Sequence, residues 1–204
     1  METQNINVGL LGLGTVGTEV AYQLLHNKNV INNPKSNVQI NLSKVLINDI
    51  TKQRPNYLSP DLITNNPDDI FNDKNINLIV ELIGGDHIAL EMINKAIDKK
   101  INIVTANKLV MSKYGHELLS QSKNNGVLLL YEASVGAGIP IIGPLYHSLI
   151  ANNITRINAI INGTTNYILS NMSSGTQTFE DALKQAQHLG YAESDPTSDI
   201  EGID

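Results

Sequence analysis

Two spacings of apolar residues alternate along the first 130 residues of the chain. Short runs rich in branched residues predict strands, because a run that is apolar throughout suits a strand buried on both faces of a parallel sheet. These runs cover residues 6–11, 38–49, 76–85, 101–108 and 127–132. Between them, apolar residues at helical spacing predict helices over residues 19–28, 88–100 and 109–125. Strands and helices that alternate in this way predict an α/β fold with a doubly wound parallel sheet.

The pattern changes after residue 130. A glycine-rich stretch is followed by an expected helix, an expected strand and a second helix, at residues 132–140, 138–150, 154–162 and 178–190 respectively. Thr178 and Asp181 have the spacing of a helix-capping pair. We therefore expect residues 1–130 to form the sheet domain, and residues 131–204 to begin an incomplete α+β domain.

Composition and charge narrow the expected partners. The 204 residues are 41% hydrophobic and 17% charged, which is enough apolar surface to bury a core. Fourteen basic and twenty acidic residues give a formal charge of -6, without a run rich in lysine and arginine. Nucleic acid is therefore not an expected partner, since a phosphate backbone requires a basic face.

The absence of cysteine excludes disulfides and thiolate zinc sites. The five histidines lie far apart, without the spacing of metal ligands. No apolar stretch reaches the roughly 18 residues of a membrane span, and the start of the chain lacks the basic region of a signal peptide. We expect a cytoplasmic protein that does not enter a membrane.

The motif GLGTVG at residues 12–17 joins the first expected strand to the first helix. Gly12 suits a tight turn, Gly14 lets backbone approach a pyrophosphate, and Gly17 allows close packing of helix and strand. The helix N-terminus offers unpaired N–H groups to phosphates. In this context the motif predicts a Rossmann-type, dinucleotide-binding domain.

The end of the second expected strand is where such domains distinguish NAD from NADP. Asp49 favours a free ribose 2′-hydroxyl, whereas Lys52 and Arg54, just after it, could hold a 2′-phosphate. The two basic residues could equally lie in a solvated loop. The sequence leaves both cofactors open.

Five later segments indicate a family. They are ELIGG at 81–85, TANK at 105–108, YEASVGAGIP at 131–140, INGTTNYIL at 161–169 and LGYAESDPTSDIEGID at 189–204. In this order behind GLGTVG, they resemble homoserine dehydrogenase along essentially the whole chain. The resemblance implies an NAD(P)-dependent oxidoreductase that interconverts L-aspartate 4-semialdehyde and L-homoserine, in the biosynthesis of threonine, methionine and isoleucine.

The resemblance also implies roles for residues near the cofactor. Besides the three glycines and Asp49, the residues expected to contact the dinucleotide are Leu13, Thr15, Val16, Gly84 and Gly190. Lys108 matches the family's lysine beside nicotinamide and substrate, where it would donate a hydrogen bond or relay a proton. Burial would lower its pKa and make it a more effective acid near neutral pH.

On the substrate side, Glu193 and Asp204 match the two family carboxylates that hold the substrate's ammonium group. For the nearby Asp195 and Asp199 we expect capping or solvated roles. A second segment resembles the family's sodium loop, in which the cation would be bound by the backbone carbonyls of Glu132, Val135, Ala137 and Ile139.

In the family, the proton-donating lysine lies one helical turn after the residue that matches Asp204. We therefore expect this chain to be an amino-terminal portion of a protein that forms a homodimer when complete. The alternative is a truncated module that binds dinucleotide without turnover. Aspartate semialdehyde dehydrogenase, another Rossmann oxidoreductase, is excluded because its mechanism needs a nucleophilic cysteine.

Overall fold

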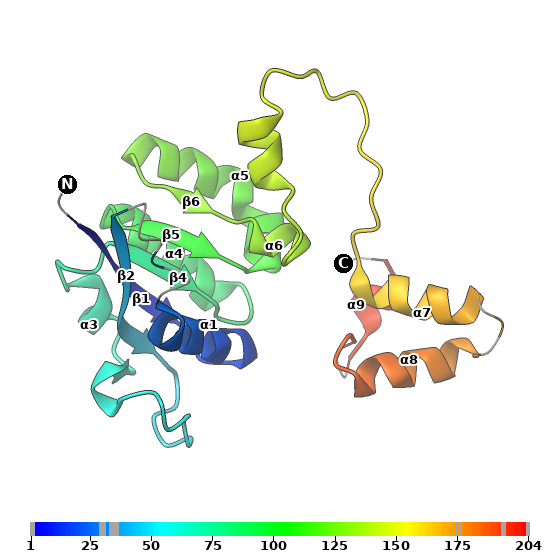
Figure 1. The fold of residues 1–204 in the computed structure, drawn as a ribbon, viewed down its shortest axis with the longest axis horizontal. Coiled ribbons are helices and arrows are strands. Elements are labelled where there is room, and N and C mark those ends of the chain that lie inside the picture. The colour runs from blue at the N-terminus through cyan, green and yellow to red at the C-terminus, as the bar shows by residue number, and fades with distance from the viewer. Residues whose placement is uncertain are drawn as a thin grey trace. The chain divides into compact units, whose positions relative to one another are not determined.

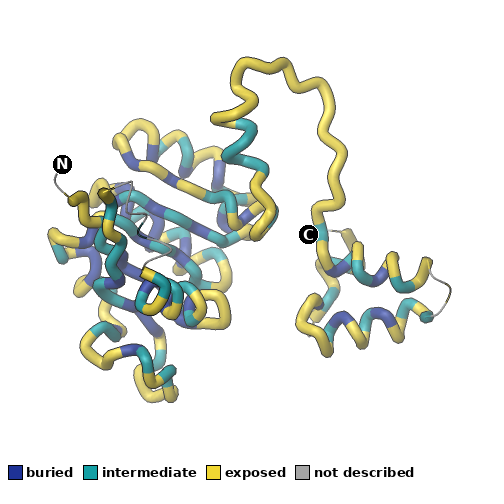
Figure 2. Tube along the Cα trace, viewed as in Figure 1, coloured by how far each residue is buried: buried dark blue, intermediate teal, exposed yellow. Residues whose placement is uncertain are grey.

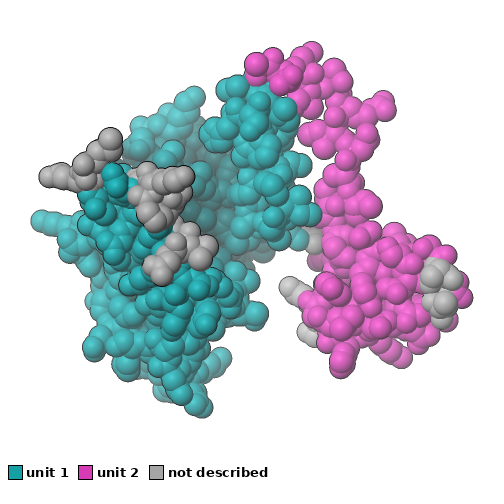
Figure 3. All heavy atoms as spheres, viewed as in Figure 1, with its two compact units in different colours: residues 1–150 teal, residues 151–204 magenta. Residues whose placement is uncertain are grey.

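The chain divides into two compact units. The computed structural model describes residues 3–28, 32, 37–173, 175, 177–192 and 195–202. The first unit is Met1–Ile150 and the second is Ala151–Asp204, coloured separately in Figure 3. The division falls after residue 150, whereas the sequence led us to expect a domain boundary after residue 130. The domain assignment itself stays a prediction.

The first unit contains one six-stranded sheet (Figure 1). Its strands are β1 (Gln4–Leu11), β2 (Val38–Leu46), β3 (Ile63–Thr64), β4 (Leu78–Glu81), β5 (Asn102–Thr105) and β6 (Leu129–Leu130). They lie in the order β3-β2-β1-β4-β5-β6, and every neighbouring pair is parallel. The order reverses between β1 and β4, as in Rossmann folds, which confirms the predicted fold class.

Helices cover both faces of this sheet. The helical elements are α1 (Thr15–His26), η1 (Pro60–Leu62), α3 (Asp68–Phe71), α4 (His87–Asp98), α5 (Lys108–Asn125), α6 (Ala133–Gly136) and η2 (Pro144–Ser148). Val8 and Leu10 of β1 share a core with Ala21 and Leu24 of α1, whereas Leu11 joins the core with α3, α4 and α5. Successive residues of a strand point to opposite faces, so β1 contributes to two cores. Figure 2 shows the buried positions along the chain in dark blue.

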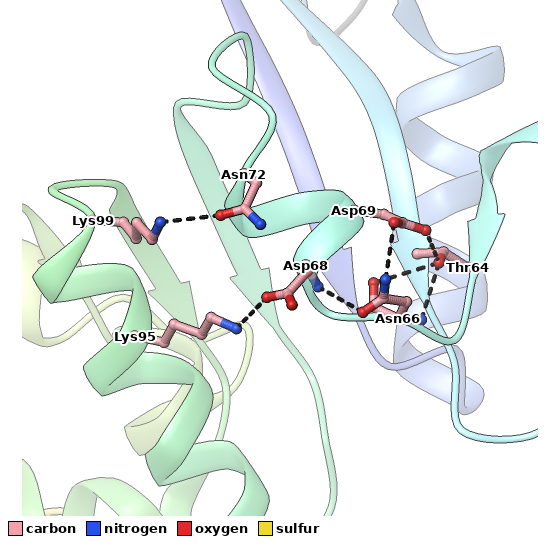
Figure 4. A network of polar contacts seen from close by, with 7 residues as sticks. All are labelled: Thr64, Asn66, Asp68, Asp69, Asn72, Lys95 and Lys99. Carbon is pink, nitrogen blue, oxygen red and sulfur yellow. Dashed lines mark hydrogen bonds and ion pairs between the residues drawn. The ribbon is translucent and has the colours of Figure 1, made fainter.

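Polar contacts fasten the short helix α3 to its surroundings (Figure 4). The Thr64 hydroxyl at the end of β3 donates a 2.5 Å hydrogen bond to the Asp69 carboxylate. The Lys95 ammonium of α4 donates at 2.7 Å to the Asp68 carboxylate, and this hydrogen bond lowers the pKa of Asp68. A helix of four residues is too short to be stable alone. These contacts and the burial of Ile70 hold it in place.

The second unit is helical in its described residues. It contains α7 (Gly163–Ser173), α8 (Phe179–His188) and α9 (Thr197–Ile200). Ile168 of α7 packs against Ala182 and Ala186 of α8 in a small core. The Thr178 hydroxyl accepts a hydrogen bond from the Asp181 N–H at the start of α8, which confirms the predicted capping pair. None of the helices in the described part of the chain is long and apolar enough to cross a membrane.

One predicted element is wrong, and another is shorter than predicted. Residues 154–162 form no strand, and Ile157 and Ile161 are exposed there. A strand needs a neighbour for its N–H and C=O groups, and no described residue pairs with this segment. Of the helix predicted over 138–150, residues 142–148 are helical and include the π-helical turn η2. Pro140 and Pro144 lack N–H donors, which limits the length of regular helix.

Candidate dinucleotide-binding and substrate site

The candidate site lies along one edge of the sheet in the first unit. Gly12 follows β1 directly, and Asp49, Gly84 and Lys108 each lie three residues after the end of β2, β4 and β5. Because these strands are parallel, their carboxyl ends meet at the same edge. Ligands of doubly wound sheets bind at this edge, where the strand order reverses.

The three glycines of the GLGTVG turn have different surroundings. Gly12 has a φ of +97°, and a Cβ there would lie 2.6 Å from the Leu82 carbonyl oxygen. A Cβ on Gly17 would overlap the Gly12 carbonyl oxygen, so α1 could not approach the end of β1 as closely. Around Gly14, by contrast, a Cβ would meet no atom within 4 Å. Gly14 is thus the position of the turn that is open to a ligand.

Gly14 is also the N-cap residue of α1, and no side chain caps this helix. The first N–H groups of a helix carry partial positive charge and lack partners within the helix. Open backbone at Gly14 and uncapped N–H groups next to it form a surface that suits a phosphate. The exposed Thr15 and Val16 flank this surface, whereas Leu13 is buried.

The close approach at Gly17 gives a stability prediction. Gly17→Ala should lower the free energy of unfolding by about 1–3 kcal/mol, because the new methyl group must displace backbone at Gly12. Thermal unfolding followed by circular dichroism measures the effect. We expect the midpoint to fall by several degrees; an unchanged midpoint would contradict the described packing of α1.

Arg54 connects the glycine-rich turn to the end of β2. Its guanidinium donates to the Asp49 carbonyl at 2.8 Å and to the Leu13 carbonyl at 3.5 Å. The Asp49 carboxylate accepts from the Thr51 hydroxyl at 2.6 Å and from the Thr51 N–H at 2.9 Å, and these bonds lower the pKa of Asp49. The ionised Asp49 carboxylate and the Arg54 guanidinium therefore both lie in the loop that follows β2. Lys52, in the same loop, is exposed.

On the other side of the strand reversal, a buried carboxylate ends β4. Glu81 is fully buried, accepts from the Thr105 hydroxyl at 2.5 Å and from the Ile83 N–H at 2.6 Å, and burial raises its pKa. The Asn107 side chain donates to the Gly85 carbonyl at 2.7 Å and caps α5 by accepting from a backbone N–H. Residues that follow β4 and β5 are thereby bound to one another.

Lys108 is the first residue of α5 and is exposed. The burial that we expected for this side chain is not found in the described part of the chain. The position follows from the Asn107 cap, which starts the helix at this residue.

The Glu132 carboxylate closes the loop after β6. It accepts from the N–H groups of Ile141 at 2.6 Å, Ile142 at 2.8 Å and Gly143 at 2.6 Å, and these hydrogen bonds lower the pKa of Glu132. Three charge-assisted bonds to one carboxylate stabilise a defined loop conformation. The side chain, and not only the backbone, of Glu132 thus shapes the segment expected to bind sodium.

The backbone hydrogen bonds and φ angles vary along the segment expected to bind sodium. The Glu132 carbonyl accepts from the Val135 N–H at 3.1 Å, and the Ile139 N–H donates to the Gly136 carbonyl at 2.9 Å. Ala137 has a φ of +51°, which is strained for a residue with a Cβ. Within the described ranges, no three His, Cys, Asp or Glu side chains lie close enough to hold a metal ion.

The second unit contains the remaining predicted site residues. Glu193 and Asp204 lie outside the described residues. Gly190 has a φ of +79° and follows the end of α8, where its N–H donates to the Gln187 carbonyl at 3.1 Å. This is the left-handed geometry that glycine adopts when it ends a helix.

Asp195 and Asp199, the acidic residues near the proposed substrate-binding pair, have partners close in sequence or in the same unit. Asp195 is exposed and accepts from the Thr197 hydroxyl at 2.5 Å and from the Thr197 N–H at 3.2 Å, but the N-cap residue of α9 is Pro196, so these bonds form a local turn before the helix. Asp199 accepts from the Asn162 side chain at 2.7 Å, which fastens α9 to the start of α7.

Models of two domains of one family match the chain. The model described as homoserine dehydrogenase, NAD binding domain, matches residues 12–132. The model described as homoserine dehydrogenase matches residues 140–204. The chain belongs to the homoserine dehydrogenase family. The resemblance predicted from its motifs is thereby confirmed, and the family is one of oxidoreductases.

Individual relatives of the chain belong to the same family. Homoserine dehydrogenase of Bacillus subtilis is 40% identical over 199 residues, which are 98% of this chain and 46% of the relative. The Synechocystis homoserine dehydrogenase is 42% identical over 203 residues, 98% of this chain and 45% of the relative. The chain thus spans about half the length of the curated relatives that it matches.

Solved homoserine dehydrogenases share the fold. The crystal structure from Thiobacillus denitrificans has a TM-score of 0.86 and 41% identity, covering 99% of this chain and 46% of that chain. A hyperthermophilic archaeal homoserine dehydrogenase in complex with NADPH has a TM-score of 0.80 and 29% identity, covering 98% of this chain and 66% of that chain.

For this chain, the sequence predicted the residues at the sheet edge but not the contacts that hold them in place. Glu81, Thr105 and Asn107 were read only as parts of motifs, and the contacts of Arg54 with backbone were not foreseen. One signal was available for Glu81: an acidic residue stood at the end of an otherwise apolar strand, where a charge is costly unless it has hydrogen-bond partners.

Proposed function

We propose that the protein containing this chain is an NAD(P)-dependent homoserine dehydrogenase, which interconverts L-aspartate 4-semialdehyde and L-homoserine. The observation that carries the proposal is the open backbone at Gly14 next to an uncapped helix, at the strand reversal of a chain in this family. The residues present therefore fit a dinucleotide. The pathway would be the biosynthesis of threonine, methionine and isoleucine.

Each group of residues has a proposed role. Residues 12–17 would bind the pyrophosphate through backbone N–H groups, and Gly84, whose surroundings have room for a Cβ, would allow close approach of the nicotinamide ribose. When bound, the reduced nicotinamide supplies the hydride that adds to the aldehyde carbon. Lys108 would donate a hydrogen bond to the substrate's carbonyl oxygen, which becomes the hydroxyl of homoserine once it gains a proton.

The substrate's amino-acid end would be held by carboxylates. An ammonium group is best bound by charge-assisted hydrogen bonds, and Glu193 and Asp204 are the proposed acceptors. Gly190 is proposed to add a backbone contact to the cofactor. Positioning two reactants in this way can contribute several kcal/mol to catalysis.

We propose NADPH as the preferred cofactor. Arg54 lies at both the Leu13 and the Asp49 backbone, and its guanidinium has five donors, of which the Nε–H has no partner among the described residues. A 2′-phosphate at the ribose would offer acceptors to the outer N–H groups of this guanidinium, since the Nε–H is buried. The archaeal relative in complex with NADPH supports the proposal.

The cofactor proposal predicts opposite effects of two substitutions. Arg54→Ala should raise the Kd of NADPH by roughly tenfold or more, as expected for the loss of a hydrogen bond to a charged group, and leave the Kd of NADH little changed. Asp49→Ser should lower the Kd of NADPH, because it removes a negative charge beside the phosphate. Titrations with both cofactors measure the change. If Arg54→Ala weakened NADH as much as NADPH, preference would not depend on Arg54.

Two further assignments belong to the proposal. The carbonyls of Glu132, Val135, Ala137 and Ile139 are the proposed ligands of a sodium ion, supported by the defined loop that the Glu132 carboxylate holds. A homodimer is proposed for the protein at the length of its relatives. The exposed isoleucines of residues 154–161 support a contact surface in that part of the chain.

Two measurements test the proposed function. NADPH is titrated into the chain while nicotinamide fluorescence is recorded, which the absence of tryptophan makes simple to interpret. Homoserine oxidation is then assayed, with a protein of the relatives' length that contains these residues, by the appearance of reduced cofactor. Binding with turnover supports the enzyme, and binding without turnover supports the alternative of a dinucleotide-binding module. A folded chain that bound neither NADPH nor NADH would contradict both.

A further inference from the structure

The proposed chemistry makes no use of the most deeply buried carboxylate in the first unit. Glu81 is completely inaccessible to solvent. No lysine, arginine or histidine forms an ion pair with it in the described part of the chain. A buried carboxylate without a cation is costly, and a strand end that only needed packing would be better served by an apolar residue. The position therefore calls for the specific hydrogen-bonding capacity of a carboxylate.

The partners of Glu81 are all donors. One carboxylate oxygen accepts from the Thr105 hydroxyl at 2.5 Å, and the other accepts from the Ile83 N–H at 2.6 Å. The Thr105 oxygen itself accepts from the Asn107 N–H at 3.0 Å, which connects the Glu81 carboxylate to the start of α5.

The same hydrogen bonds continue to both loops that follow these strands. The Asn107 side chain donates to the carbonyls of Ile83 at 3.0 Å and Gly85 at 2.7 Å, while its oxygen accepts from the Val110 N–H at 3.0 Å and caps α5. Gly84 lies within the first loop, and Lys108 follows Asn107 directly. We call Glu81, Thr105 and Asn107 the loop clamp.

The loop clamp lies on one side of the strand reversal. Asp49 and Arg54, which follow β2, lie on the adenosine side, since the residue after the second strand contacts the adenosine ribose in this fold. The loops after β4 and β5 lie beyond β1 in the sheet order, and so on the side of the other nucleotide. A defect confined to these loops should spare the adenosine half.

We propose that Glu81 is a positioning residue for the nicotinamide half of the cofactor, and that through Thr105 and Asn107 it fixes the backbone at Gly84 and the start of α5 at Lys108. The inference rests on the proposed dinucleotide site and assigns to Glu81 no contact with substrate or cofactor. Burial of Glu81 disfavours its charged form and raises the pKa of the carboxyl. This loss of stability is the cost of holding the two loops together.

The chain contains a matched control. Thr64, like Thr105, is a buried threonine at the carboxyl end of a strand, and its hydroxyl also donates at 2.5 Å to a carboxylate, that of Asp69 (Figure 4). Thr105→Val and Thr64→Val therefore remove the same kind of hydrogen bond. Only the first of the two hydrogen bonds belongs to the loop clamp.

The experiment compares NADPH with 2′-phospho-ADP-ribose, which lacks the nicotinamide. In the unsubstituted chain we expect NADPH to bind more tightly than the fragment and its nicotinamide fluorescence to rise. Thr105→Val should weaken NADPH by about tenfold, as for loss of one hydrogen bond to a charged group, and reduce the fluorescence rise, while the fragment's Kd stays within about twofold. Thr64→Val should change neither the affinity of NADPH relative to the fragment nor the fluorescence rise.

Glu81→Gln serves as the second variant, because it keeps the size of the side chain and should fold if Thr105→Val does not. It places an NH2 group against one of two donors, so the same selective loss is expected. Equal weakening of both ligands, or no weakening of NADPH, in these variants would overturn the inference. So would an unsubstituted chain that binds both ligands equally without a fluorescence rise. If that chain bound neither ligand, the proposed function itself would fail.

Discussion

Replacing Gly14 by valine should reduce NADPH binding by well over tenfold, which corresponds to about 1.4 kcal/mol or more. The position has the open surroundings that a Cβ requires and a φ of -79°, so the variant should fold normally. Its side chain would occupy the space through which a pyrophosphate reaches the backbone N–H groups. Fluorescence titration with NADPH measures the loss.

The contrast with Gly17→Ala makes this prediction specific. Gly17→Ala is expected to lower stability, because its methyl group overlaps backbone, whereas Gly14→Val is expected to lower binding at unchanged thermal stability. A folded Gly14→Val variant that bound NADPH with the original affinity would show that the glycine-rich turn is not the pyrophosphate site.

Replacing Lys108 by alanine should lower kcat/KM for homoserine by about 10² to 10³, the usual cost of losing one hydrogen-bond donor to an oxygen on which charge develops. The assay uses a protein of the relatives' length that contains these residues. Lys108 follows the Asn107 cap at the carboxyl end of β5, on the edge where the cofactor is proposed to bind. The effect should fall mainly on kcat if the lysine acts in the transition state.

Lys113, on the same helix, provides the control. Its ammonium donates to the Asp86 carboxylate at 2.7 Å, so it is held away from a catalytic role. Lys113→Ala should leave kcat/KM within a few-fold of the original value. If the two lysine variants had equal activity, Lys108 would have no part in the reaction.

The sequence predicted elements whose residues alone indicate their structure, and it failed for an element that needs a pairing strand elsewhere in the chain. The runs around Leu11 and Ile79 are apolar on both faces, so the parallel strands were predictable from composition alone. The helix predicted over residues 109–125 ends as expected, at Gly126, which has a φ of +69°. The segment 154–162 has the same apolar character, yet it forms no strand, because a strand also requires a neighbour that composition does not reveal.

The candidate site was predictable where chemistry depends on one residue at one place. Gly12 and Gly17 each have a steric requirement that no other residue meets equally well, Gly14 leaves its backbone open to a ligand, and the spacing of all three is visible in the sequence. The loop clamp was not predictable, because Glu81 and Thr105 are 24 positions apart in the sequence. Only strand pairing, which aligns Glu81 with Thr105, brings them together.

The sheet of the first unit has a consequence for biosynthesis. Every strand described in it lies before residue 131, and its most distant pairing in sequence is between β1 and β4, where Val8 is opposite Leu78. Domains tend to fold as units while the ribosome is still adding residues. The six described strands can therefore pair during translation, before the helices of the second unit have left the exit tunnel.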